Sequence, residues 1–225
     1  EDIDIILLPE MFNTSFCPKH TSLAESMNGT SFNWMLKISR KYQTAISGTI
    51  MVKEGKSIYN RLIWISKEGK RYTYDKRHLF SLIGEDRYLS RGKNRLILEE
   101  QGWKICPLIC YDLRFPVFSR NNVNYEVLVF LANWPEKRID AWHTLLKARA
   151  IENQCYVVGV NRVGIDKSGT NFSGGSKVFD GLGKEIFSAS DNNEEVVEVK
   201  ITKTELRRIR KEVNFLRDQD KFTVL

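Results

Sequence analysis

ICPLICYDLRFP, residues 105–116, is a short apolar run that ends on a cysteine and continues directly into polar residues. The run from Ile105 to Ile109 has the length and composition of a buried β-strand. Cys110 is therefore expected at the carboxyl end of a strand, where a rigid backbone holds its sulfur toward a cleft. A nucleophilic cysteine needs such a position, together with a free backbone N–H for the developing oxyanion. The alternative is a small apolar side chain in the core, where free cysteines are usually found.

Two further segments favour the catalytic interpretation. LLPE, residues 7–10, is an apolar strand ending on Glu10, and YDKRHLF, residues 74–80, sets Lys76 just before a second apolar pair. Taken singly, Glu10 is typical of a solvated loop, and Lys76 beside Asp75 is typical of a surface ion pair worth at most about 1 kcal/mol. Taken together, a thiol, a carboxylate and an ammonium supply a nucleophile, a proton carrier and a cation.

These segments, in this order, resemble the nitrilase superfamily, the carbon-nitrogen hydrolases, which use a Glu-Lys-Cys triad. The longer strings are most similar to the bacterial omega-amidases, and the resemblance runs from residue 1 to residue 225; the strings are YDKRHLF (74–80), CYDLRFP (110–116), NWP (133–135) and ARAIENQ (148–154). The resemblance implies an α/β fold, the four-layer αββα sandwich in which two mixed sheets pack face to face. It also implies a homodimer paired across a helical face, and no cofactor.

For the site, the resemblance implies that Cys110 attacks the amide carbon while Glu10 moves the proton. Lys76 and the backbone N–H of Tyr111 would hold the oxyanion. Glu85 opens a Glu-x-x-x-Leu-x-x-Gly segment and would position substrate and tune the lysine or the base; the alternative is a plain loop acid. A lysine within about 4 to 6 Å should also favour the ionised form of a neighbouring carboxylate or thiol by lowering its pKa.

Two residues are candidates for substrate binding. Arg114 lies four residues past Cys110, and its planar guanidinium can pair bidentately with a substrate carboxylate. A salt bridge to Asp112 or Glu152 is the alternative. Trp134 follows an expected strand end and could form an apolar wall for a short substrate chain, or belong to the core or a dimer interface.

The function that these strings imply is hydrolysis of the terminal amide of a small α-keto acid amide such as 2-oxoglutaramate. The products would be a dicarboxylate and ammonia, formed through a cysteine thioester. Two alternatives stay open. One is another carbon-nitrogen hydrolase activity, on carbamoyl amines or nitriles, and the other is a non-catalytic interaction protein on the same fold.

Composition and sequence pattern argue against several other classes of protein. With 225 residues and 42% apolar residues, the chain suits one domain, residues 1–225. No apolar stretch approaches the roughly 18 to 20 residues of a membrane helix, so we expect a cytoplasmic protein without a membrane partner. The four scattered cysteines are expected to be reduced, and the three histidines stand alone, without metal-ligand spacing.

The net charge of +7 comes largely from a basic carboxyl-terminal run. That run lacks the interleaved aromatic residues and glycines of an RNA-binding strand motif, so it is expected to be a solvated helix face rather than a nucleic-acid site. A basic background would modestly favour a small anionic amide as substrate.

Apolar periodicity predicts the elements around these motifs. Helices are expected at 32–42 and 142–154, and a loop at 164–175; strands are expected at 3–8, 44–52, 57–66, 95–99, 103–109, 127–132, 157–160, 176–179, 185–188 and 194–201, with one further strand that ends at Lys76. Members of the superfamily begin with a strand and a helix before the Pro-Glu strand, whereas Glu1 lies only nine residues before Glu10. We therefore expect the first strand-helix unit to be missing from this sequence.

Overall fold

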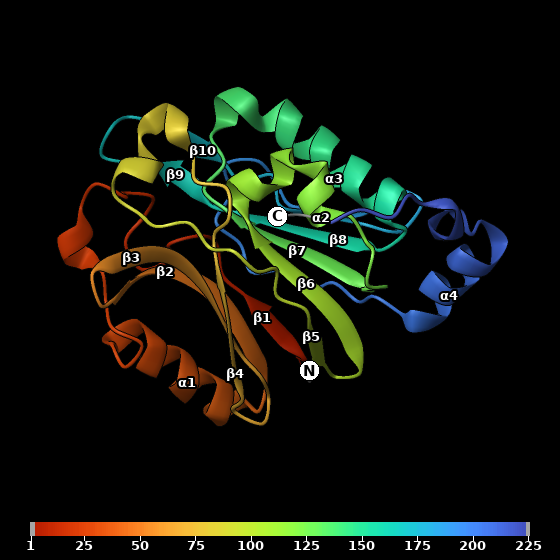
Figure 1. Cartoon of the computed structure of the whole chain (residues 1–225), viewed down its shortest axis with the longest axis horizontal. Coiled ribbons are helices and arrows are strands. Elements are labelled where there is room, and N and C mark those ends of the chain that lie inside the picture. The colour runs from red at the N-terminus through yellow and green to blue at the C-terminus, as the bar shows by residue number, and fades with distance from the viewer. Residues whose placement is uncertain (1–2, 224–225) are drawn as a thin grey trace.

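The computed structural model describes residues 3–223 and contains two large sheets packed against each other (Figure 1). Helix α1 (Thr30–Tyr42) covers the outer face of one sheet, and helix α3 (Ile139–Asn153) covers the outer face of the other. The order of layers is thus helix, sheet, sheet, helix. The predicted four-layer αββα sandwich is confirmed.

The first sheet has the strand order β1-β2-β3-β4. Its strands are β1 (Ile5–Leu7), β2 (Ala45–Glu54), β3 (Ser57–Ile65) and β4 (Arg71–Asp75). Alternate side chains of β3 serve two cores: Ile63 and Ile65 pack with Phe32 of α1, whereas Leu62 and Trp64 face the second sheet. Because both faces are covered, the strands carry apolar residues on both faces.

The second sheet has the order β12-β11-β8-β7-β6-β5. Its strands are β5 (Leu98–Glu100), β6 (Trp103–Ile109), β7 (Val127–Ala132), β8 (Tyr156–Asn161), β11 (Lys177–Phe179) and β12 (Glu185–Ser188). The central strands β6, β7 and β8 run parallel and are almost continuously apolar. Their carboxyl ends therefore meet at one edge, and this edge carries Cys110 after β6 and Asn133 after β7.

The helices bury one stripe each. In α3 the buried residues include Trp142, Leu146, Ala150 and Asn153, which recur at helical spacing and face the second sheet. Helix α4 (Lys203–Glu212) buries only Leu206 and Ile209. Arg207, Arg208 and Lys211 are exposed, as predicted for a solvated helix face, whereas Lys203 binds Glu126 and Arg210 binds the carbonyl oxygens of Gln154 and Tyr125. Short helical turns complete the fold: η1 (Thr21–Leu23), η2 (Ser81–Ile83), η3 (Glu85–Arg87), η4 (Cys110–Arg114), α2 (Pro116–Ser119), η5 (Glu136–Arg138) and η6 (Phe215–Asp218).

Two sequence-based expectations are wrong, and the strand predicted at 95–99 begins only at Leu98. The predicted loop at 164–175 contains a small hairpin, β9 (Val163–Ile165) with β10 (Asn171–Ser173), closed by hydrogen bonds around Asp166. The predicted strand at 194–201 does not form in the structure. Its alternating valines suit a strand, but β-propensity depends on a partner, and no strand of residues 3–223 pairs with this segment, where Val196 is fully exposed.

The structure also bears on disulfide bonds, metal binding and membrane spans. Cys17, Cys106, Cys110 and Cys155 are all free thiols. Across the described part of the chain, histidine, cysteine and acidic side chains form no cluster of three or more that could hold a metal ion. None of the helices within residues 3–223 has both the length and the apolar character needed to cross a bilayer.

Candidate active site

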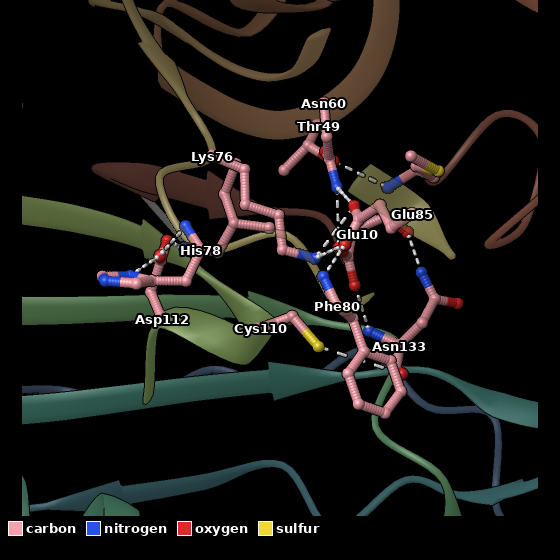
Figure 2. Close-up of polar contacts among 12 residues, drawn as sticks. Glu10, Thr49, Asn60, Lys76, His78, Phe80, Glu85, Cys110, Asp112 and Asn133 are labelled. Carbon is pink, nitrogen blue, oxygen red and sulfur yellow. Dashed lines mark hydrogen bonds and ion pairs between the residues drawn. The ribbon is translucent and has the colours of Figure 1, made fainter. Parts of the chain in front are cut away.

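Glu10, Lys76 and Glu85 meet in one buried cluster, as Figure 2 shows. Glu10 follows β1, Lys76 follows β4, and Glu85 begins η3. The Nζ atom of Lys76 lies 2.8 Å from Oε1 of Glu10 and 3.0 Å from Oε2 of Glu85. All three side chains are inaccessible to solvent. The structure therefore brings together three of the residues that the sequence singled out.

The charges in this cluster depend on one another. Burial by itself would lower the pKa of Lys76, but the two carboxylates outweigh burial and raise that pKa above its usual range. Lys76 therefore stays an ammonium at neutral pH. Burial raises the pKa of Glu85, and Lys76 lowers it by less, while Glu10 adds a further rise. One ammonium thus faces two carboxyl groups.

Asn60 on β3 connects the two carboxylates. Its Nδ2 donates to Oε1 of Glu10 at 2.7 Å and to Oε1 of Glu85 at 3.3 Å. Thr49 on β2 donates its hydroxyl to Oδ1 of Asn60 at 2.8 Å, which fixes which way the amide points. Sequence analysis missed both residues. The available signal was a polar side chain inside an otherwise apolar strand, where burial requires a hydrogen-bond partner.

Asn133 holds Glu10 from the second sheet. Its backbone N–H donates to Oε2 of Glu10 at 2.9 Å, and its Nδ2 donates to the backbone carbonyl of Glu10 at 2.5 Å. The sulfur of Cys110 lies 4.0 Å from the carbonyl oxygen of Asn133 (Figure 2). Asn133 is thus the residue that places the carboxylate and the thiol at the same strand edge, and sequence analysis did not assign it this role.

Cys110 begins the turn η4 with φ of +41°, a left-handed conformation that residues other than glycine rarely adopt. Such a conformation costs on the order of 1–3 kcal/mol and persists only where surrounding contacts impose it. Burial and the charge of Glu10 raise the pKa of the Cys110 thiol well above its usual range, and Lys76 only partly offsets the rise. Lys76 lowers the pKa of this thiol, as expected, but burial and Glu10 outweigh that effect. The resting form is a thiol beside a proton acceptor.

Asp112 is the side chain that fixes this turn. Its Oδ2 accepts hydrogen bonds from the backbone N–H of Ile109 at 3.0 Å and from the hydroxyl of Tyr74 at 2.7 Å. Its Oδ1 accepts from the backbone N–H of His78 at 3.0 Å and lies 2.8 Å from Nδ1 of that residue. The carboxylate is fully buried. It therefore links the segment after β4, which carries Lys76, to the segment that carries the cysteine.

The remaining predicted residues surround the cysteine. Tyr111 is the second residue of η4, and the first N–H groups of a helical turn have no acceptor within it. Arg114 forms no ion pair with any residue between 3 and 223, because Asp112 is engaged as described and Glu152 pairs with Arg149 at 3.1 Å.

The guanidinium of Arg114 lies 4.8 Å from the ring centroid of Trp134. Trp134 itself is 3% exposed, and its ring packs on Trp142. The structure thus places Trp134 in the core, where one face of its ring supports Arg114. Its indole N–H donates to the carbonyl oxygen of Arg138 at 2.7 Å, which brings a second arginine, missed by sequence analysis, next to the site.

Comparisons with known proteins agree with the fold and with the predicted resemblance. The family model for carbon-nitrogen hydrolases matches residues 1–211. An omega-amidase, YafV, of Yersinia enterocolitica is 38% identical over 224 residues, which cover 99% of this chain and 86% of the relative. A 2-oxoglutaramate amidase of Bacillus subtilis is 34% identical over 215 residues, covering 93% of this chain and 82% of the relative.

A solved structure gives the same result. A carbon-nitrogen hydrolase superfamily protein from Xanthomonas campestris, described with an arsenic adduct in its active site, superposes with a TM-score of 0.96 at 38% identity. The match covers 98% of this chain and 86% of that protein. From the sequence match and the superposition together, we conclude that the chain belongs to the carbon-nitrogen hydrolase family.

Proposed function

We propose that the protein hydrolyses the terminal amide of a small α-keto acid amide, similar to 2-oxoglutaramate, through a thioester on Cys110. One observation carries this proposal: the carboxylate of Glu10 contacts the Lys76 ammonium at 2.8 Å and accepts the backbone N–H of Asn133, whose carbonyl oxygen lies 4.0 Å from the sulfur of Cys110. A nucleophile, a base and a cation thus share one site. The names of the relatives, omega-amidase and 2-oxoglutaramate amidase, support this substrate class.

In the first half of the reaction, the sulfur of Cys110 attacks the amide carbon while Glu10 accepts the thiol proton. The raised pKa of the thiol makes this base necessary, because little thiolate is present at rest. The Lys76 ammonium and the backbone N–H of Tyr111 stabilise the negative charge on the carbonyl oxygen. Glu10 then delivers its proton to the departing nitrogen, ammonia leaves, and a thioester remains.

In the second half, Glu10 removes a proton from water as the water attacks the thioester carbon. The tetrahedral intermediate collapses, the carbon–sulfur bond breaks, and the sulfur recovers its proton from Glu10. The product is a carboxylic acid that ionises to the dicarboxylate. One carboxylate therefore serves both halves, which requires it to stay in place; Asn60 and Asn133 hold both of its oxygens.

Glu85 acts in this proposal through Lys76. Its two oxygens lie 3.1 and 3.0 Å from Nζ of Lys76, and one of them also accepts from the backbone N–H of Phe80 at 2.6 Å. Glu85 thereby anchors the ammonium and keeps it charged. We assign Glu85 as a positioning residue.

The same family resemblance leads us to propose a cytoplasmic homodimer in which residues 1–225 form one domain. Exposed apolar side chains on and around the helical side support a subunit contact, among them Val117, Ile151 and Phe215. Light scattering coupled to gel filtration tests the proposal. A mass of one chain, 26.2 kDa, across a range of concentrations would reject the dimer.

The function is tested by incubating the enzyme with 2-oxoglutaramate, a carbamoyl amine and a nitrile while ammonia and carbon dioxide are measured. We expect ammonia from the amide, and rapid acid quenching followed by mass spectrometry should show an acyl group on Cys110. Faster turnover of the carbamoyl compound or the nitrile would move the chain to another activity of the family. Absence of turnover of all three would favour a non-catalytic protein.

A further inference from the structure

Arg138, the last residue of η5, lies beside an aromatic side chain of the site. Its guanidinium carbon is 5.2 Å from the ring centroid of Phe80, and that ring is 4.8 Å from the ring of Tyr111, which follows the nucleophile. The backbone N–H of Phe80 donates to Glu85. Arg138 is therefore separated by single side chains from both the cysteine turn and the charged cluster.

Arg138 is also connected to Arg114. The backbone carbonyl of Arg138 accepts the indole N–H of Trp134 at 2.7 Å, and the Arg114 guanidinium lies over that same indole at 4.8 Å. Trp134 is rigid, because it is 3% exposed and also donates its backbone N–H to Asn161 at 2.7 Å. One buried ring thus binds the backbone of Arg138 and lies under the guanidinium of Arg114.

Neither arginine has a carboxylate partner among residues 3–223. The neighbouring acids are engaged elsewhere, Asp112 with His78 and Tyr74, and Glu136 with Asn171 at 2.6 Å. Burial lowers the pKa of Arg138, and the charge of Arg114 lowers it further. Two partly buried cations that repel each other without an internal counter-ion are a costly arrangement, and a bound anion removes that cost.

We propose that Arg138 and Arg114 form a two-arginine site for the carboxylate at the end of the substrate remote from the amide. Arg114 pairs with that carboxylate from above the Trp134 ring, and Arg138 binds it from the side of Phe80. The ligand class is therefore the ω-monoamides of short dicarboxylic acids. This inference rests on the proposed amidase function, which it deepens by naming a second residue that selects the substrate.

The kinetic experiment compares glutaramate, which carries the carboxylate, with pentanamide, a neutral amide of the same length. Arg138→Met keeps the length of the side chain over Phe80 and removes the charge. We expect KM for glutaramate to rise by at least about tenfold, the loss expected for one charge-assisted contact, and pentanamide hydrolysis to change by less than about twofold. Arg207→Met, on the exposed face of α4, loses the same charge and should leave both substrates unchanged. Equal losses on glutaramate and pentanamide would mean that Arg138 is structural.

A binding experiment separates failure of this inference from failure of the proposed function. Glutarate binding to Cys110→Ala protein is measured by calorimetry, which needs no turnover. We expect glutarate to bind, Arg138→Met and Arg114→Met each to weaken it by at least about tenfold, and the double variant to lose less than the product of the two. Absence of glutarate binding, or binding unaffected by Arg138→Met, would overturn the two-arginine site even if the enzyme hydrolyses amides. Arg138→Lys replaces the methionine variant if the latter fails to fold, and should recover only part of the affinity.

Discussion

At the scale of single residues, the neutral thiol of Cys110 gives the clearest expectation. Burial and Glu10 raise its pKa well above 9.0. The thiolate of Cys110 absorbs at 240 nm, and its contribution is the difference between the wild-type protein and Cys110→Ala. That difference should appear only above pH 9.0. A rise in this absorbance near neutral pH in the wild-type protein would contradict a raised pKa for Cys110. The enzyme should therefore depend on its base rather than on a pre-formed thiolate.

Glu10→Gln separates the effect of Glu10 on the pKa of Cys110 from the role of Glu10 as the base in hydrolysis. The amide removes the negative charge and the accepting carboxylate that raise the pKa of Cys110, so the thiolate step should move to lower pH. Hydrolysis should nevertheless fall by at least about 100-fold, since the amide cannot carry protons. Titration at 240 nm and an ammonia assay on the same preparation check both outcomes. A variant with unchanged titration, or with most of its activity, would remove Glu10 from the role of base.

The left-handed backbone of Cys110 allows a test of strain. At φ of +41° glycine avoids the clash of a Cβ atom, so Cys110→Gly should be more stable than Cys110→Ala by about 1 kcal/mol. Cys106, in the middle of strand β6, provides the matched control, and there glycine should be less stable than alanine by about 0.5–1 kcal/mol. Urea unfolding of the four variants gives the two differences. If glycine were less stable than alanine at both positions, the turn at Cys110 would not be strained.

At the scale of elements, the turn η4 depends on one carboxylate. Tyr74→Phe removes two hydrogen bonds, the one that the hydroxyl donates to Asp112 and the one that it accepts from the backbone N–H of Arg77, and should cost about 1–3 kcal/mol of unfolding free energy. Asp112→Ala leaves several buried donors without an acceptor and should cost roughly 3 kcal/mol or more. It should also slow alkylation of Cys110, because the sulfur is no longer held toward Glu10. Similar losses for the two variants, measured by urea unfolding, would argue against Asp112 as the organiser of the turn.

The sequence predicted the elements that have a local signal. Parallel strands β6 and β7 are continuous apolar runs, so their ends, and with them Cys110, could be located. The contacts that hold Glu10 could not, because Asn133 lies 123 residues away in the chain and Asn60 lies 50 residues away. The left-handed φ of Cys110 has no local signal either, since it results from contacts made by Asp112. Residues 194–201 show the opposite error, a strand-like pattern without a neighbouring strand.

At the scale of the whole molecule, the net charge of +7 predicts a salt effect. Long-range attraction of an anion is screened over about 8 Å at physiological ionic strength, so kcat/KM for glutaramate should fall as salt rises. Pentanamide carries no charge, and its kcat/KM should stay nearly constant. Steady-state kinetics over a range of sodium chloride concentrations gives both slopes. Equal slopes would show that the basic surface plays no part in substrate capture.

The position of Glu10 between the sheets has a consequence for refolding. Asn60 of the first sheet and Asn133 of the second both bind this one carboxylate, whereas Cys110 comes only with the second sheet. A chain with formed helices and strands but separated sheets therefore lacks a complete catalytic group. Recovery of activity after dilution from urea should lag behind the far-ultraviolet circular dichroism signal and coincide with burial of Trp64, which lies between the sheets. The time course of recovered activity then reports when the two sheets pack against each other.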